Sequence, residues 1–225
     1  MANTKATPVM MQFWKAKENH PNSILLFRMG DFYETFEDDA VETSKVLGIT
    51  LTKRANGSAS SVPLAGFPYH SLDQHLHKLL KAGHRVAICE QVEDPKKAKG
   101  IVRREVVEVI SPGIAITEQF LNQKENNYLM CLFGVEGKFG FSLLDHSTGE
   151  FKTGERDLSK LNTIVQQFRP SEIIVPEFQL NDFQTRIGKK ILFTPYHEWM
   201  FDERSCYNRI VEHFNSQNLK GYGLE

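Results

Sequence analysis

A Gly-Asp pair interrupts an apolar stretch near the N-terminus. Residues 24–27 are uniformly apolar and predict a short buried strand, which Gly30-Asp31 ends. Apolar side chains then recur at helical spacing, and Gly48 provides a C-terminal stop signal, so a helix is expected over residues 31–47. A buried strand followed closely by an amphipathic helix is typical of an α/β domain.

Helix and strand signals continue to alternate up to residue 113. Thr7-Pro8 predicts an N-cap followed by proline in the first helical turn. Ser71 with Gln74 predicts a capping-box start for a helix that ends at Gly83. Strands are expected at 85–91 and 102–110, and a loop at 55–61. The fold class predicted for residues 1–113 is a mixed-sheet α/β domain.

Pro112-Gly113 ends this domain, and residues 114–127 form the expected linker. The predicted second domain, residues 128–225, begins with hairpin strands at 128–135, 139–145 and 150–152. Helices at 158–168, 180–187 and 203–215 then alternate with strands at 172–175 and 191–194. By analogy of element order, this is an RNase H-like α/β domain.

Composition excludes several classes of protein. The 225 residues are 40% hydrophobic and 24% charged, as in soluble globular proteins, and contain no apolar run long enough to span a membrane. The net charge of −1 argues against a protein that coats nucleic acid, so any DNA would bind to a local patch. Cys89, Cys131 and Cys206 are too widely spaced for a C-x-x-C motif, which favours reduced thiols over a disulfide or metal framework.

Three stretches resemble one known family. Residues 27–36 read Phe-Arg-Met-Gly-Asp-Phe-Tyr-Glu-Thr-Phe, residues 51–54 read Leu-Thr-Lys-Arg, and residues 63–70 read Pro-Leu-Ala-Gly-Phe-Pro-Tyr-His. In this order they resemble the N-terminal part of the MutS family of DNA mismatch-repair proteins, and the resemblance extends to the last residue. It implies a mismatch-recognition domain and most of a connector domain. A Phe-x-Glu pair reads the mismatch in that family, which here implies Phe32 and Glu34.

The chemistry of this pair suits a reader of duplex DNA that ignores sequence. A mismatched step is easier to unstack, and an apolar wedge such as Phe32 probes that deformability from the minor groove. Glu34 is repelled by phosphates unless a base offers it a hydrogen bond, which makes it a discriminator. Phe32 should then be exposed. Two alternatives stay open: Asp31 and Glu34 match a capping box, and Phe32 could be a core ring.

Basic and aromatic neighbours complete the predicted interface. Lys53 and Arg54 precede a Gly/Ser-rich segment and suit phosphate contacts, although a solvated surface pair is the alternative. Lys96, Lys97 and Lys99 fit a solvated turn better than a contact. The full set of predicted DNA-binding residues is Phe32, Glu34, Lys53, Arg54, Met29, Tyr33, His70 and Arg104.

Catalysis and metal binding are weaker hypotheses. Asp145 at a strand end before Ser147-Thr148-Gly149 resembles the first metal-binding carboxylate of RNase H-like nucleases, so a metal-dependent nuclease is the alternative function. A turn-forming aspartate is the better interpretation, because the later strand brings only Glu172 and Glu177 at its ends and the resemblance implies a non-catalytic connector. His70, His75 and His77 do not form a metal motif, since residues 75 and 77 point to different sides of a helix.

The resemblance also carries expectations for a longer protein. This chain lacks the G-x-x-x-x-G-K-[ST] phosphate loop, so we expect no enzyme activity and no cofactor here, with ATP and Mg²⁺ bound by a C-terminal ATPase domain. The expected partners are double-stranded DNA with mismatches or small loops, a second subunit in a homodimer, and a MutL-type protein on the connector domain. The expected location is the bacterial cytoplasm, at the nucleoid. A relative that binds junctions or stalled ribosomes is a further alternative, against which Phe-x-Glu argues.

Overall fold

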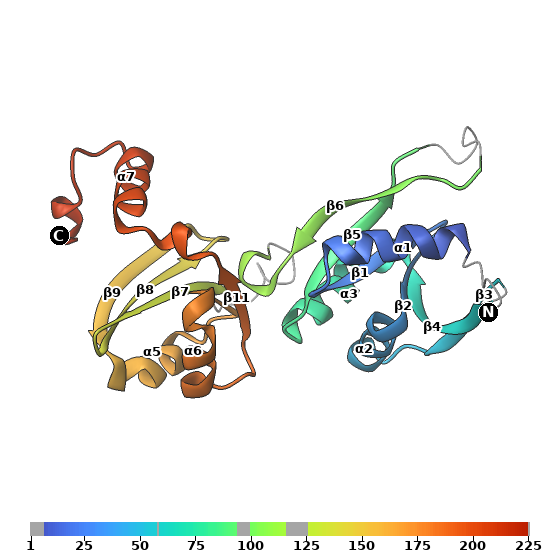
Figure 1. Cartoon of the computed structure of the whole chain (residues 1–225), viewed down its shortest axis with the longest axis horizontal. Helices are drawn as coiled ribbons and strands as arrows, with labels where there is room; N and C mark the ends of the chain where they lie inside the picture. Colours follow the sequence, from blue (N-terminus) through green and yellow to red (C-terminus); the bar gives the residue numbers. More distant parts are fainter. Residues whose placement is uncertain (1–6, 58, 94–99, 116–125, 225) are drawn as a thin grey trace. The chain divides into compact units, whose positions relative to one another are not determined.

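The structure is a computed structural model that describes residues 7–57, 59–93, 100–115 and 126–224. The chain divides into two compact units. The first comprises Met1–Asn127 with Asp145–Gly149, and the second comprises Tyr128–Leu144 and Glu150–Glu225. Each unit is built on a mixed β-sheet with helices packed against it (Figure 1). The α/β fold class predicted for both units is therefore confirmed.

Within the described residues, the sheet of the first unit has six strands in the order β3-β4-β2-β1-β5-β6. They are β1 (Ser23–Met29), β2 (Phe32–Phe36), β3 (Thr52–Asn56), β4 (Ala59–Pro68), β5 (Arg85–Gln91) and β6 (Arg104–Ile110). β1 and β5 are parallel, and the other neighbours are antiparallel. Gly30-Asp31 is the two-residue turn between β1 and β2. Gly30 has a φ of +57°, which glycine adopts without steric cost.

Helices cover both faces of this sheet (Figure 1). They are α1 (Pro8–Asn19) on one face and α2 (Glu37–Leu47) and α3 (Leu72–Lys81) on the other. Because side chains alternate along a strand, β1 supplies both cores. Leu25 and Phe27 pack with Phe13 of α1, whereas Ile24 and Leu26 pack with α2 and α3 residues. Burial of both faces explains why residues 24–27 are apolar without alternation.

Several sequence predictions for the first unit are confirmed. The Thr7 side chain accepts a hydrogen bond from the Met10 backbone N–H at 3.4 Å, and Pro8 lies in the first turn of α1. β5 occupies the predicted residues 85–91. The predicted helix at α3 also forms. However, the side chain of Ser71 makes no capping hydrogen bond, so the expected capping box is absent there.

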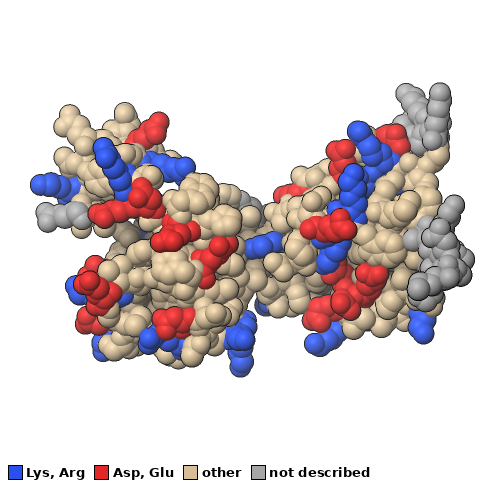
Figure 2. All heavy atoms as spheres, viewed as in Figure 1, with Lys and Arg blue, Asp and Glu red and all other residues tan. Residues whose placement is uncertain are grey.

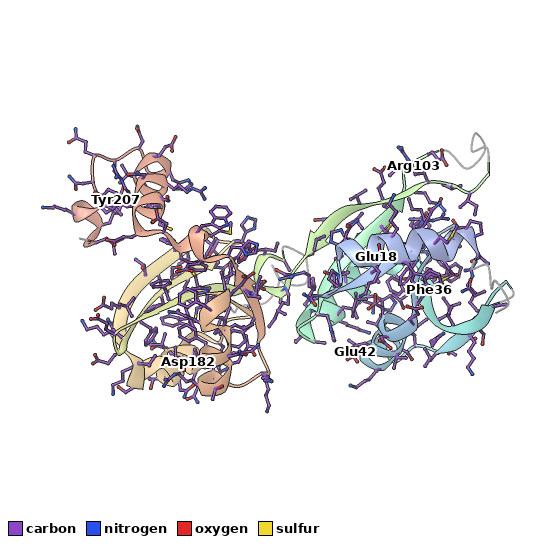
Figure 3. The ribbon with its side chains drawn as sticks, viewed as in Figure 1. Glu18, Phe36, Glu42, Arg103, Asp182 and Tyr207 are labelled. Atoms are coloured by element: carbon purple, nitrogen blue, oxygen red, sulfur yellow. The ribbon has the colours of Figure 1, made fainter. Side chains whose placement is uncertain are left out.

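The predicted helix over residues 31–47 is wrong in its N-terminal part. Residues 32–36 form β2, and α2 begins only at Glu37. Aromatic and β-branched side chains favour a strand here, and pairing with β1 and β4 satisfies the backbone on both sides. Phe36, labelled in Figure 3, is fully buried as expected, but at the end of a strand rather than in a helix.

The predicted loop at residues 55–61 is also wrong. It contains the end of β3 and the start of β4, and Asn56 pairs with Ala59 in their antiparallel ladder. Gly57 has a φ of +61° at the turn, so the glycine that indicated a loop serves a tight hairpin. Ala115, at the start of the predicted linker, packs in the core of the first unit. Residues 116–125 of that linker and Lys96, Lys97 and Lys99 lie outside the described residues.

The sheet of the second unit has the order β11-β10-β7-β8-β9 in the described part of the chain. Its strands are β7 (Tyr128–Val135), β8 (Lys138–Asp145), β9 (Glu150–Asp157), β10 (Glu172–Pro176) and β11 (Leu192–Tyr196). β10 is parallel to both β7 and β11. Three consecutive strands thus lie side by side, and the two strands that follow helices lie beyond β7. The predicted RNase H-like arrangement is confirmed.

The core of this second sheet includes residues from α5 (Leu161–Phe168) and α6 (Leu180–Ile187). Met130, Leu132 and Phe139 are fully or almost fully buried there. In contrast, α7 (Glu203–His213), on which Figure 3 labels Tyr207, contains no buried residue. Among the described residues, no helix is both long enough and apolar enough to cross a membrane.

Candidate nucleic-acid interface

The hairpin formed by β1 and β2 presents Phe32 at the surface. Phe32 is the first residue after the Gly30-Asp31 turn and lies opposite Met29 in the ladder. Its side chain is 47% exposed, which confirms the expected exposure and excludes the alternative of a core ring. Met29 is partly buried and packs against the α1 side of the sheet, so it supports the hairpin beneath the exposed ring.

Glu34 lies on the same face of β2 as Phe32, since the two residues are two positions apart in a strand. Its carboxylate accepts a hydrogen bond from the Arg54 guanidinium, with Nη1 and Oε2 separated by 2.6 Å. The side chain is only 20% exposed. Burial raises the pKa of the Glu34 carboxyl above its usual value, although Arg54 and Arg104 both act to lower it. The helix-capping alternative is wrong, because Glu34 lies within a strand.

Gly66 leaves the space that Glu34 occupies. It lies opposite Glu34 in the ladder between β2 and β4. A Cβ atom at this position would lie 2.9 Å from the Tyr33 carbonyl oxygen and 3.3 Å from Glu34 Cγ. Glycine is therefore required for the close approach of these strands. The sequence contained a usable signal for this role, since a glycine inside a strand often marks such an approach.

Lys53 and Arg54 point to opposite sides of β3. The Arg54 guanidinium turns towards Glu34 and lies 5.8 Å from the centre of the Phe36 ring. Lys53 precedes it and is exposed, so alternation along the strand places its side chain on the other side. The structure thus brings Arg54, but not Lys53, to the face of Phe32 and Glu34.

Tyr33 does not belong to this surface. Alternation places it on the opposite face of β2, where its side chain is only 2% exposed. Its hydroxyl group donates a hydrogen bond to Glu90. Burial and the contact with Glu90 raise the pKa of Tyr33 to about 12. The predicted DNA contact at Tyr33 is therefore replaced by a core role that fixes β2 against β5.

The Arg104 guanidinium donates hydrogen bonds to backbone carbonyl groups. Its Nε donates to the Arg28 carbonyl oxygen at 2.6 Å, and its Nη1 donates to the Val102 carbonyl oxygen at 2.8 Å. The guanidinium also lies 5.2 Å from the centre of the Phe27 ring. Burial lowers the pKa of Arg104. This half-buried side chain supports the β1 end of the hairpin.

Sequence reasoning missed a second support for the turn. Arg28 Nε donates to the Gly30 carbonyl oxygen at 2.5 Å, and its guanidinium lies 4.0 Å from the centre of the Tyr69 ring. The Tyr69 backbone N–H in turn donates to the Asp31 carbonyl oxygen at 2.9 Å. His70 follows Tyr69 and is exposed, so it lies beside the turn that carries Phe32.

Charge on the molecule is mixed. Figure 2 shows basic and acidic side chains interspersed over the face in view, without a continuous basic surface. This agrees with the net charge of −1. On the face in view, positive charge is local, as the composition predicts.

Asp145 is a turn-forming residue. Its side chain is fully buried and accepts hydrogen bonds from the Ser147 backbone N–H at 2.9 Å and the Ser147 hydroxyl at 2.6 Å. The backbone N–H groups of Asn127 and Thr148 also donate to it. Burial alone would raise the pKa of Asp145, but these hydrogen bonds outweigh it and hold the pKa below its usual value. The carboxylate is occupied by the turn, contrary to the nuclease alternative.

Two of the histidines considered as metal ligands, His75 and His77, pack within the first unit. His75 on α3 lies 4.4 Å from the Phe67 ring centre, and burial lowers its pKa. His77 is also buried, with a lowered pKa. Within the described residues, no three His, Cys, Asp or Glu side chains are grouped as metal ligands would be.

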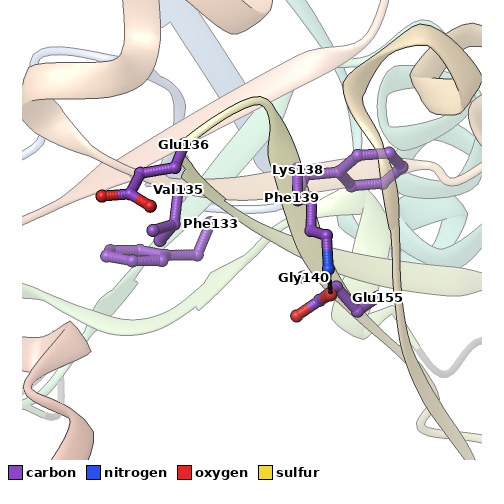
Figure 4. Close-up of a pocket in the computed structure, with 7 residues that line it drawn as sticks. All are labelled: Phe133, Val135, Glu136, Lys138, Phe139, Gly140 and Glu155. Carbon is purple, nitrogen blue, oxygen red and sulfur yellow. Dashed lines mark hydrogen bonds and ion pairs between the residues drawn. The ribbon is translucent and has the colours of Figure 1, made fainter.

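The second unit has a shallow pocket of about 380 Å³ at the β7–β8 hairpin (Figure 4). An ion pair between Lys138 and Glu155, 2.7 Å apart, lies along one side. The remaining lining residues are Phe133, Val135, Glu136, Phe139 and Gly140. The pocket combines one ion pair and a further acid, Glu136, with a partly aromatic wall.

Comparisons with known proteins agree with this architecture of two tandem α/β domains. Residues 7–119 match the family model described as MutS domain I, and residues 127–225 match that described as MutS domain II. The chain therefore belongs to the MutS family.

Similar relatives include three bacterial proteins named DNA mismatch repair protein MutS. Those of Phocaeicola vulgatus, Salinibacter ruber and Flavobacterium psychrophilum are 45%, 47% and 46% identical to this chain. The alignments cover 97%, 97% and 98% of the chain but only 25%, 25% and 26% of the relatives. The chain thus spans about a quarter of their length.

Proposed function

We propose that this chain binds double-stranded DNA containing mismatches or small loops, as part of a longer protein that acts in mismatch repair. The observation that carries the proposal is the half-exposed Phe32 ring at the start of β2, with a carboxylate on the same face, in a domain that matches MutS domain I. An aromatic ring exposed beside a supported two-residue turn is a suitable wedge for a base step.

The wedge explains recognition without sequence preference. The minor groove offers too little donor and acceptor information to identify each base pair, whereas a mispaired step is easier to unstack and kink. Stacking of Phe32 on the mispaired base contributes about 1–3 kcal/mol for any base. The contacts of Arg28 and Arg104 with the hairpin backbone keep the ring in place while the DNA deforms.

Glu34 supplies discrimination. A carboxylate is repelled by phosphates unless a cation neutralises it, and it gains free energy on DNA only where a base donates or shares a hydrogen bond. His70 follows Tyr69 beside the turn that carries Phe32 and would contact the DNA backbone without specifying sequence. Lys53 lies on the other side of β3 and would reach the DNA backbone only away from the Phe32 face, whereas Met29 supports the hairpin from the core.

The proposal extends to a longer protein through family membership. We place ATP and Mg²⁺ binding outside these 225 residues, which contain no G-x-x-x-x-G-K-[ST] motif. We also propose that the longer bacterial protein is a cytoplasmic homodimer and that its connector domain binds a MutL-type partner. Size-exclusion chromatography with light scattering and a pull-down with and without the second unit would test these assemblies.

The deciding experiment compares matched and mismatched duplexes in binding assays with the longer protein. Phe32→Ala should lower affinity for the mismatched duplex by roughly 10- to 100-fold, because the stacking free energy of about 1–3 kcal/mol is lost. Affinity for the matched duplex should change little. Folding should be unaffected, since the ring is half-exposed.

Phe151→Ala provides a matched control. Phe151 on β9 is 48% exposed, almost the same as Phe32, but belongs to the second unit. Its removal should leave the ratio of the two affinities unchanged. Equal discrimination by Phe32→Ala and the parent would refute the proposal. A preference for branched junctions over mismatches in the same assay would favour the alternative family relatives.

A further inference from the structure

The carboxylate proposed to read the base already has a partner within the protein. Arg54 reaches from β3 across β4 to Glu34, and the 2.6 Å contact joins two side chains that are 31% and 20% exposed. Arg54 passes the buried Phe36 ring, which restricts the directions open to its guanidinium. The sheet thus holds an ion pair beside the exposed Phe32 ring.

We propose that Arg54 is a specificity-determining residue that gates Glu34. The guanidinium holds the reader carboxylate in the free protein and on matched DNA, and Glu34 exchanges it for a base only at a mismatch. This inference rests on the proposed DNA-reading function of the same surface. It assigns Arg54 a role distinct from the simple phosphate contact that the sequence predicted.

The gate follows from charge and geometry. While the pair is closed, Glu34 and Arg54 together are close to neutral, so matched DNA experiences little repulsion from the carboxylate. A well-stacked base pair offers Glu34 no hydrogen bond strong enough to replace its contact with Arg54. When Phe32 unstacks a mispaired base, that base offers one, and the released Arg54 can contact a phosphate.

Among the described residues, the other neighbours of Glu34 do not form a second gate of this kind. Gly66 lies beside it on β4 and has no side chain. Arg104 on β6 attracts the carboxylate, but its Nε and Nη1 groups donate to backbone carbonyls. Arg54 is therefore the cation positioned to exchange partners, because its guanidinium donates directly to the Glu34 carboxylate.

The test measures the ratio of mismatched to matched affinity in the longer protein at one fixed salt concentration. In the Arg54→Gln variant, the uncompensated carboxylate should weaken matched binding, while mismatched binding no longer requires an ion pair to break. The ratio should therefore rise about three- to tenfold, as expected for coupled residues in direct contact. In a Glu34→Gln background, Arg54→Gln should lower both affinities equally and leave the ratio unchanged.

Lys53→Gln is the matched control. Lys53 is the neighbouring cation on β3, but its side chain lies on the other side of the strand. Its removal should lower both affinities alike whether residue 34 is Glu or Gln. If Arg54→Gln behaves like Lys53→Gln, or lowers the ratio in the Glu34 background, the gate does not exist.

A measurement without DNA separates this inference from the proposed function. In the 225-residue chain, NMR titration of labelled Glu34 should show that Arg54→Gln raises the carboxyl pKa and that Lys53→Gln does not. If the pKa does not respond, the ion pair does not form and the inference fails. If Phe32→Ala retains full discrimination, the proposed function fails even when Glu34 and Arg54 are paired. If Phe32→Ala loses discrimination while the Arg54→Gln ratio is unchanged, only the gate fails.

Discussion

Two regions of the molecule bury a carboxylate, one with several backbone hydrogen-bond donors around it and the other with a single charged side chain. At the turn after β8, Asp145 is fully buried, and backbone N–H groups from three residues donate to it. On β2, Glu34 is mostly buried with one charged partner, Arg54. The pKa of Asp145 is lowered and that of Glu34 is raised. Hydrogen bonds outweigh burial at Asp145, whereas burial outweighs the contact with Arg54 at Glu34.

The difference separates a structural acid from a candidate reader. Asp145 has its lone pairs occupied by groups that cannot move without unfolding the turn, so it has little capacity for a ligand. Glu34 is held by one flexible side chain and is disfavoured as an anion where it lies. A carboxylate that is destabilised in this way gains by finding a donor, which is the property that discrimination requires.

The largest stability effect should come from Asp145→Ala. Loss of the buried carboxylate removes the hydrogen bonds that Asn127, Ser147 and Thr148 donate to it, which should lower the free energy of unfolding by about 2–4 kcal/mol. Amide hydrogen exchange along β8 in the 225-residue chain would measure it.

Asp157→Ala is the control for this change. Asp157 is an exposed acid at the end of β9, and its side chain makes no capping hydrogen bond, so its removal should have an effect within about 0.5 kcal/mol. If Asp145→Ala is equally mild, the turn does not depend on its carboxylate, and the nuclease alternative regains support.

Gly66→Ala should have the next largest effect, because it fills the space beside Glu34. The new Cβ would lie 2.9 Å from a backbone oxygen, so β2 and β4 must separate, at a cost of about 1–3 kcal/mol. Gly140→Ala on β8 is a suitable control when it is followed by β8 amide exchange, since the atom nearest its Cβ is 4.0 Å away. Urea unfolding followed by Trp14 fluorescence, in a Trp199→Phe background, would report on the first unit. An unperturbed Gly66→Ala variant would show that Glu34 does not need this space.

Much of the fold could be predicted because local signals agree with tertiary structure. Thr7-Pro8 starts α1, and the apolar pattern of β5 and β7 matches the observed strands to the residue. The prediction failed at β2, where Tyr33, Phe36 and Leu47 happen to fit a helical period. The strand forms because β1 and β4 flank it, and the pairing with β4 joins segments far apart in the sequence.

The site was predictable only in part for the same reason. Phe32 and Glu34 are two positions apart, so their shared face follows once the strand is known. The partnership of Glu34 with Arg54 depends on the order β3-β4-β2, and β4 contains Pro63, Gly66 and Pro68, which disfavour a strand prediction. The engagement of Arg104 with the β1 backbone likewise follows from β5 lying between β1 and β6.

The smallest expected effect is the pH dependence of stability at Glu34 and Asp145. Burial raises the pKa of Glu34, so its favourable contribution is complete below its ordinary pKa of about 4.5 and is lost as pH rises through its pKa in the folded chain. The stability of Glu34→Gln relative to the parent should therefore improve between pH 4 and pH 7, by less than about 1 kcal/mol for a partly exposed pair.

Asp145→Asn should show the opposite trend in a lower pH window, because the lowered pKa of Asp145 gives a contribution to stability that disappears only as pH falls below about 3.8. Urea unfolding of both variants at matched pH values would measure the two trends, with Trp14 reporting on the first unit and β8 amide exchange on the second. The expectation for Glu34 fails if the stability difference between Glu34→Gln and the parent is independent of pH, or follows the same direction as that of Asp145→Asn. Either result would mean that Arg54 fully compensates the buried carboxylate and that Glu34, like Asp145, is stabilised as an anion in the folded chain.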